Sequence, residues 1–156
     1  MEQSLKEFYM HEAIKEAKKA AEGGDIPVGA VVVFDGQIIG RGRNLRVANH
    51  DATAHAEVVA LKEAGNALGR WNLTGAEIFI TLEPCVMCAG AIVNARIKKV
   101  YFGAFDPRFG AAGTLINLVG WDKLNHRAEI EGGVLEVECA VVLKEHFKEL
   151  RKKHLA

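Results

Sequence analysis

The chain lacks long apolar runs, a rich cysteine complement and an excess of charge of either sign. Its 156 residues include 3 Cys and 3 Pro, and 20 basic side chains balance 20 acidic ones. The purest apolar runs, 26–34 and 85–93, are about half the ~18 residues that a transmembrane helix needs, so no membrane span is expected. Acids and bases alternate near the N-terminus, which excludes a secretory signal and argues against a transit peptide. These absences predict a soluble, cytoplasmic protein.

The composition is that of an ordinary globular domain. Apolar side chains make up 49% of the chain and charged ones 26%, which excludes disordered and collagen-like classes. The length is typical of one domain and is sufficient to bury a core. We therefore expect a single domain over residues 1–156, with no repeat and no linker.

Three cysteines are too few and too unevenly spaced for a disulfide scaffold. Cys85 and Cys88 form a C-x-x-C pair, and Cys139 follows about fifty positions later. In a cytosolic chain such a pair indicates metal or redox chemistry. Cys139 falls on the apolar face of the last expected helix, which favours a buried small side chain over a ligand.

The net charge of zero conceals local basic clusters. Their members are Arg41, Arg43 and Arg46; Arg96, Lys98, Lys99 and Arg108; and Lys144, Lys148, Arg151, Lys152 and Lys153. Together they could form a basic stripe that binds the phosphates of a nucleic acid. The alternative is that they are three separate solvated surfaces.

Hydrophobic periodicity and turn signals predict alternating helices and strands. A capping box at Ser4–Glu7 should open a helix that ends near residue 23, with Phe8 on its buried face. Asp35-Gly36 predicts a hairpin between strands 28–34 and 37–43. Further elements are expected as helices at about 53–69, 85–96 and 136–154 (the last amphipathic and basic), a helical turn at 114–119, and strands at 76–82, 99–102 and 127–131. This alternation predicts a three-layer α/β/α sandwich with a mixed sheet of about five strands and helices on both faces.

Potential metal ligands stand at the start of two expected helices. Cys85 and Cys88 are three residues apart, so both thiols can face one ion, and the helix N-terminus favours the thiolate. With His55 they make three protein ligands, the number typical of a catalytic zinc site that keeps a position for water. Glu57, Cys139 or another histidine could be a fourth ligand. Glu57 lies only two residues from His55, so it is better placed as a proton carrier beside the open position.

The motifs resemble a known family of enzymes. His55-Ala56-Glu57 followed by Pro84-Cys85-Val86-Met87-Cys88 is the H-x-E…P-C-x-x-C signature of zinc-dependent nucleobase deaminases. Further matching blocks are Pro27–Ala30, Thr53–Glu57, Thr81–Ala91, Phe102–Ala104 and Asn125–Arg127. Over about residues 8–153 the chain is similar to the bacterial tRNA-specific adenosine deaminases. The resemblance implies a cytidine deaminase-like fold, one Zn²⁺ per subunit, a homodimer, and hydrolysis of the wobble adenosine of a tRNA anticodon stem-loop to inosine.

The resemblance also implies residue roles. His55, Cys85 and Cys88 match the zinc ligands, and Glu57 matches the proton shuttle between water, the base and the departing ammonia. Asn44 matches a residue that hydrogen-bonds the flipped nucleotide. The other matches are an apolar wall for the base (Pro27, Val28), a loop facing the anticodon backbone (Ala104, Asp106, Arg108) and a C-terminal helix that closes on the RNA (Phe147, Lys148, Arg151). Ala52 and His146 depart from the family pattern without touching the zinc chemistry.

Several alternatives remain open from the sequence. Asn44 could be a turn residue that ends a strand, Asp106 could belong to a structural turn with Pro107, and Phe147 could be the last core residue of its helix. The protein could instead deaminate a free nucleobase or nucleoside of the guanine or cytosine type. A non-catalytic zinc module and a thioredoxin-like redox protein are the other two classes.

Overall fold

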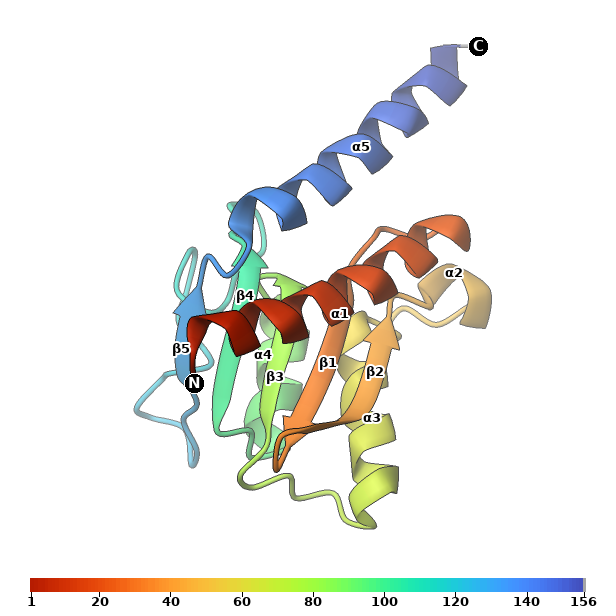
Figure 1. Ribbon diagram of the computed structural model, residues 1–156. Helices are drawn as coiled ribbons and strands as arrows, with labels where there is room; N and C mark the ends of the chain where they lie inside the picture. Colours follow the sequence, from red (N-terminus) through yellow and green to blue (C-terminus); the bar gives the residue numbers. More distant parts are fainter. Residues whose placement is uncertain (156) are drawn as a thin grey trace.

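A computed structural model describes residues 1–155 as helices and strands in three layers (Figure 1). In chain order the elements are α1 Gln3–Glu22, β1 Gly29–Phe34, β2 Gln37–Arg43, α2 Arg46–Asn49, α3 Ala56–Leu68, β3 Glu77–Leu82, α4 Val86–Asn94, β4 Lys99–Ala104, β5 Glu129–Gly132 and α5 Glu136–Leu155. No helix among these residues is long and apolar enough to cross a membrane.

The five strands form one mixed sheet in the order β2-β1-β3-β4-β5. The β1–β2 and β1–β3 pairs are antiparallel, whereas the β3–β4 and β4–β5 pairs are parallel. Helices α1 and α5 lie on one face of the sheet and α3 and α4 on the other (Figure 1). The predicted α/β/α sandwich is therefore confirmed.

Both faces of the sheet are buried, which explains why its central strands are continuously apolar. In β1, Val31 and Val33 pack towards α1 and α5, and Val32 packs towards α3 and α4. Side chains on one face of a strand alternate with those on the other, so a strand covered on both sides needs apolar residues throughout. Phe79 of β3 and Tyr101 of β4 stack on the first face with ring centroids 4.3 Å apart.

The β1–β2 hairpin has the predicted turn. Asp35 and Gly36 have φ values of 50° and 73°, which a two-residue type I′ turn requires at both central positions. Further along the chain, α4 connects the parallel strands β3 and β4, whose C-terminal ends pair as Leu82 with Ala104. This crossover brings the segment after β3 and the loop after β4 to the same edge of the sheet.

Three local predictions were wrong. Helix α1 begins at Gln3 after Glu2, so Ser4 lies inside it and no side chain caps it. Phe8 is 53% exposed, and the helix buries Tyr9 instead. No helical turn forms at 114–119, because the N–H groups of Ala112 and Thr114 donate to the Glu83 carboxylate rather than to a helical ladder.

Helix α5 packs on the sheet only through its first turns. Cys139 is buried, as the sequence predicts, whereas Phe147 is 41% exposed and is not a core residue. Figure 1 shows the C-terminal half of α5 projecting away from the sheet. The basic side chains Lys148, Arg151, Lys152 and Lys153 of this half are exposed, and Lys152 pairs with Glu149 at 3.8 Å.

Candidate active site

His55, Cys85 and Cys88 converge between the N-terminal ends of α3 and α4. The Nδ1 atom of His55 lies 3.7 Å from Cys85 Sγ and 3.5 Å from Cys88 Sγ. His55 and Cys85 are the N-caps of the two helices, whereas the sequence predicted both residues to lie inside them. The extended backbone of His55 and Cys85 precedes the first helical turn, and Cys88 lies within the first turn of α4.

The three donor atoms fit a tetrahedral zinc ion. They all lie within 4.8 Å of one another, and among residues 1–155 they form the one such group of three or more. Zn–S and Zn–N bonds of about 2.3 and 2.0–2.1 Å at a tetrahedral angle put sulfur and nitrogen about 3.5–3.6 Å apart. The observed separations agree with that value. Three protein ligands leave the fourth position of the ion for water.

Cys139 does not belong to this group. It packs with Val31, Phe79 and Tyr101 in the core on the α1 and α5 face of the sheet, whereas α3 and α4 lie on the opposite face. Burial raises the pKa of its thiol to about 12, so it remains protonated at neutral pH. The sequence-based interpretation of Cys139 as a buried small side chain is confirmed.

The thiols and the imidazole are arranged to hold a cation. Hydrogen bonds from Cys88 and then from His55 lower the pKa of the Cys85 thiol to about 4, so Cys85 is a thiolate. The same contact with Cys85 raises the pKa of His55 and that of Cys88, which hold the protons of the group. A bound dication takes the place of such protons.

Glu57 lies in the first turn of α3 beside the Cys88 thiol and is 4% exposed. Burial raises the pKa of its carboxyl to about 7. A group with a pKa near the working pH both accepts and releases a proton readily, which suits a general acid–base catalyst. Glu57 is not a member of the close donor group, and its role as proton carrier stays a prediction.

Asn44 is a buried connection rather than a simple turn residue. Its Nδ2 donates to the Ile26 carbonyl at 2.9 Å, and its Oδ1 accepts the Ala56 N–H at 2.9 Å. It therefore fixes the segment that carries the buried Pro27 and Val28 to the first residue of α3. An amide group has a second N–H and a second lone pair, so contact with a substrate stays compatible with these bonds.

We expect Asn44→Ala to damage both the fold and catalysis. The Ala56 N–H loses its partner, whereas the Ile26 carbonyl keeps the Val28 N–H, so the free energy of unfolding should fall by about 1–3 kcal/mol. If Asn44 also contacts the substrate, kcat/KM should fall about 5- to 150-fold. Thermal unfolding and steady-state kinetics check both effects, with Asn49→Ala on the exposed surface of α2 as the control. A lowered melting temperature with unchanged kcat/KM would leave Asn44 a purely structural role.

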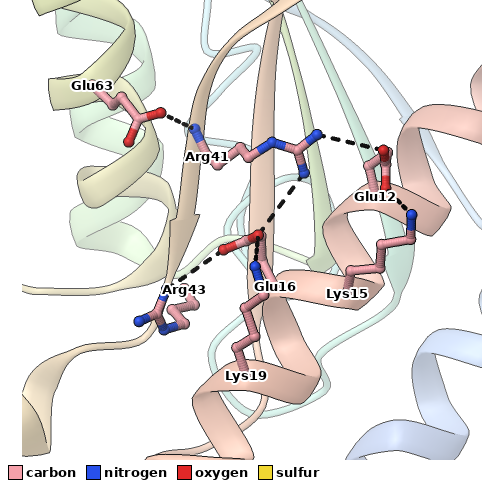
Figure 2. A network of polar contacts seen from close by, with 7 residues as sticks. All are labelled: Glu12, Lys15, Glu16, Lys19, Arg41, Arg43 and Glu63. Carbon is pink, nitrogen blue, oxygen red and sulfur yellow. Dashed lines mark hydrogen bonds and ion pairs between the residues drawn. The ribbon is translucent and has the colours of Figure 1, made fainter.

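The first basic cluster is neutralised by acids from α1 and from the segment that follows it. Figure 2 shows Arg41 and Arg43 of β2 reaching the almost fully buried Glu16. Their Nη1 atoms lie 3.9 and 3.7 Å from its carboxylate oxygens. Arg41 also pairs with Glu12, and Arg46 pairs with the buried Asp25 at 2.9 Å. For this cluster the structure favours a structural role, holding α1 to the edge strand, over a phosphate-binding stripe.

The remaining predicted contact residues lie in two regions. Ala104 is buried and ends β4, at the end of the sheet where Cys85 caps α4. The Asp106 carboxylate accepts the N–H groups of Arg108 and Phe109, so it stabilises a local turn, and Arg108 is exposed. Phe147, Lys148 and Arg151 lie in the projecting half of α5, which no described contact joins to the zinc ligands.

Sequence comparisons agree with this geometry. The profile of the cytidine and deoxycytidylate deaminase zinc-binding region matches residues 3–104, which include the three predicted ligands and Glu57. The chain belongs to this family of zinc-binding deaminases. It is 55% identical over 150 residues to the tRNA-specific adenosine deaminase of Bacillus subtilis, an alignment that covers 96% of this chain and 93% of that protein.

Solved structures share this fold. A structure from work on A-to-I editing by tRNA:A34 deaminases at the wobble position superimposes with a TM-score of 0.84 at 40% identity. That alignment covers 87% of this chain and 99% of the other. A guanine deaminase from Nitrosomonas europaea shares the fold, with a TM-score of 0.79 at 24% identity over 90% of this chain and 83% of its own. The predicted resemblance is thus confirmed.

Proposed function

We propose that the protein hydrolyses the wobble adenosine of a tRNA anticodon to inosine, releasing ammonia. The observation that carries this proposal is the His55, Cys85 and Cys88 donor group beside the buried Glu57. One histidine and two cysteines as zinc ligands, with a nearby glutamate that is not a ligand, are the active-site residues of zinc-dependent deaminases. The similarity to tRNA-specific adenosine deaminases over nearly the whole chain supports tRNA as the substrate.

In this mechanism His55, Cys85 and Cys88 would hold zinc, which would lower the pKa of a bound water so that hydroxide is available near neutral pH. Glu57 takes a proton from the attacking water and delivers it to N1 of the adenine as the oxygen bonds to C6. The carboxylate then takes the proton of the new C6 hydroxyl and gives it to the departing amine, which leaves as ammonia while C6 becomes a carbonyl, so Glu57 serves as base and acid in turn. Burial raises the pKa of its carboxyl, which favours the uptake of the proton that it then passes on.

Substrate contacts are proposed for the residues around this group. Pro27 and Val28 form an apolar wall for the base, and Asn44 uses its remaining donor and acceptor on the flipped nucleotide. Backbone contacts come from the loop with Ala104, Asp106 and Arg108 and from Phe147, Lys148 and Arg151 of α5. A base must be drawn out of its stack to reach the buried Glu57, so the flanking backbone has to be held.

Deamination of a free base is the competing activity, since the guanine deaminase fold is so similar. The test is ammonia release from an anticodon stem-loop with adenosine at the wobble position, compared with free guanine, cytosine and adenosine under the same conditions. Turnover of the stem-loop alone supports the proposal. If a free base is deaminated while the stem-loop stays unreacted, the protein is a free-base deaminase and the proposal is wrong.

We also propose that the protein works as a homodimer in the cytoplasm, where tRNA is available. Support comes from the outer surface of α4, on which Val86 and Met87 are exposed (60% and 37%) although α4 is strongly apolar. Covering such side chains favours association. Sedimentation analysis should give the mass of two chains, and a single-chain mass at micromolar concentration would contradict the dimer.

The basic end of α5 should contribute to RNA affinity. Truncation after Phe147 removes Lys148, Arg151, Lys152 and Lys153, all of which are exposed. Because binding a phosphate releases counterions, the slope of log affinity against log salt should flatten by roughly 0.7 for each single-strand phosphate that the truncated chain no longer binds. Zinc content and melting temperature should stay unchanged.

Stem-loop binding over a salt series, for the intact and truncated chains, measures this effect. The full-length double variant Lys148→Gln and Arg151→Gln removes charge without shortening the helix. It therefore separates the effect of lost charge from the effect of a shorter helix. Identical slopes for all chains would show that the tail is only a solvated helix end. The basic residues between Arg96 and Arg108 would then be the surface to test.

A further inference from the structure

Glu83 is a buried carboxylate that the proposed chemistry does not use. It follows β3, precedes Pro84 and Cys85, and is 2% exposed. Its Oε1 accepts the Asp106 N–H at 3.1 Å and the hydroxyl of Thr114. Its Oε2 accepts the N–H groups of Ala112 and Thr114 at 3.1 and 3.0 Å. Both oxygens are thus fully engaged.

The partners of Glu83 are unusual because none of them is a cation. Among the ion pairs of residues 1–155, none includes Glu83. Its described donors all come from one segment of nine residues, 106–114. Hydrogen bonds to an ionised carboxylate are about twice as strong as neutral ones. The carboxylate therefore organises that segment and nothing else.

The segment 106–114 closes tightly around the carboxylate. A Cβ added at Gly110 would lie 2.5 Å from the Glu83 carboxyl carbon and 2.5 Å from Oε1, so only glycine fits. Two main-chain hydrogen bonds join the neighbouring segments without involving the Glu83 side chain. The Glu83 N–H donates to the Ala104 carbonyl at 2.9 Å, and the Ala111 N–H donates to the Pro84 carbonyl at 2.8 Å. Apart from one isolated bridge, between Ala112 and Asn117, the segment has no strand or helix pairing.

One side chain thus connects the zinc ligands to an exposed loop. Glu83 is two residues from Cys85, and the segment that it holds displays Arg108 and Phe109, the latter 63% exposed. We propose that Glu83 is a positioning residue, which sets the loop 106–114 at a fixed place relative to the zinc-binding turn. The loop can then hold the RNA backbone while the target base reaches Glu57. This inference rests on the proposed function, in which the loop faces tRNA.

Glu83→Gln tests the inference because it keeps the shape of the side chain. The amide retains one acceptor oxygen but turns an NH₂ group towards N–H donors, so at least one hydrogen bond is lost on the Oε1 side and two on the Oε2 side. Zinc content should stay at the wild-type level. KM for the anticodon stem-loop should rise at least about tenfold, with kcat changing less than about threefold. Loss of a residue with a merely structural role would not raise KM while leaving kcat nearly unchanged.

Limited proteolysis gives a readout that needs no RNA. Trypsin cleaves after Arg108 only when the loop opens, so cleavage there should be accelerated at least about tenfold in Glu83→Gln. Glu129→Gln, an exposed carboxylate on β5, is the matched control and should behave as wild type. Thr114→Val removes a single hydroxyl donor and should shift both readouts in the same direction by a smaller factor, even if Glu83→Gln fails to fold.

The outcomes separate the two proposals. Unchanged KM and unchanged tryptic cleavage in both variants would overturn the positioning role of Glu83, and so would a fall in kcat at constant KM. If the wild-type protein leaves the stem-loop unreacted, the proposed function fails instead. Tryptic cleavage then still decides whether Glu83 holds the loop.

Discussion

Replacement of Glu57 by alanine is expected to abolish deamination while leaving zinc bound. The donor group of His55, Cys85 and Cys88 does not include Glu57, so the ion keeps its three ligands. The proton transfers lose their carrier, and general acid–base catalysis by one group commonly contributes about 10²–10⁴-fold. Since Glu57 serves more than one transfer, the loss of kcat should be at least that large. Metal analysis beside the rate of inosine formation provides the measurement.

Two controls sharpen this result. Glu57→Gln keeps the size of the buried side chain but cannot carry the proton, so it should retain zinc and be nearly as inactive as Glu57→Ala. Glu63→Ala removes an exposed carboxylate from the same helix and should retain most activity. An empty zinc site in Glu57→Ala would show that the carboxylate is a metal ligand, contrary to the mechanism given above.

Cys88→Ser should lose zinc, activity and thermal stability together. A serine hydroxyl is a poor zinc ligand compared with a thiolate. Cys88 is fully buried and lies 3.5 Å from His55 Nδ1, so the ion joins the beginnings of α3 and α4 at this point. Without it that connection is lost, which should lower the melting temperature.

Cys139→Ala is the matched control for Cys88→Ser. It removes a buried thiol that lies on the opposite face of the sheet, away from the zinc ligands. The Cys139→Ala protein should therefore keep both zinc and activity. Zinc content, melting temperature and deamination rate should be measured on both variants. If the Cys88→Ser protein is active and contains a full complement of zinc, the proposed metal site is wrong.

Local chemistry made much of the site predictable from sequence. Zinc requires particular donor atoms on short, fixed spacings, so His55, Cys85 and Cys88 could be identified without coordinates. A type I′ turn requires positive φ at both central residues, which Asp-Gly adopts readily, so the Asp35-Gly36 hairpin could likewise be predicted from sequence. The helix starts were predicted less accurately, because His55 and Cys85 adopt the extended backbone of N-cap residues and the helices begin one residue after each of them.

Contacts between distant segments were not predictable. The arginines of β2 look like an isolated basic cluster in sequence, yet Glu12 and Glu16 of α1 pair with Arg41 and Arg43 only once the helix packs on the sheet (Figure 2). Glu83 carries no sequence signal for its role, since its donors follow it by 23 to 31 positions. Tertiary pairing of this kind overrides local propensity, as the missing helical turn at 114–119 also shows.

The central claim is most directly tested with synthetic anticodon stem-loops that carry one adenosine each. In one the adenosine occupies the wobble position, and in the other it is moved by one position within the same loop. The account predicts inosine in the first, with little in the second and none from free adenosine, and no inosine from the first with Glu57→Gln. Equal conversion at both positions, or conversion of free adenosine with an unreacted wobble stem-loop, would contradict it.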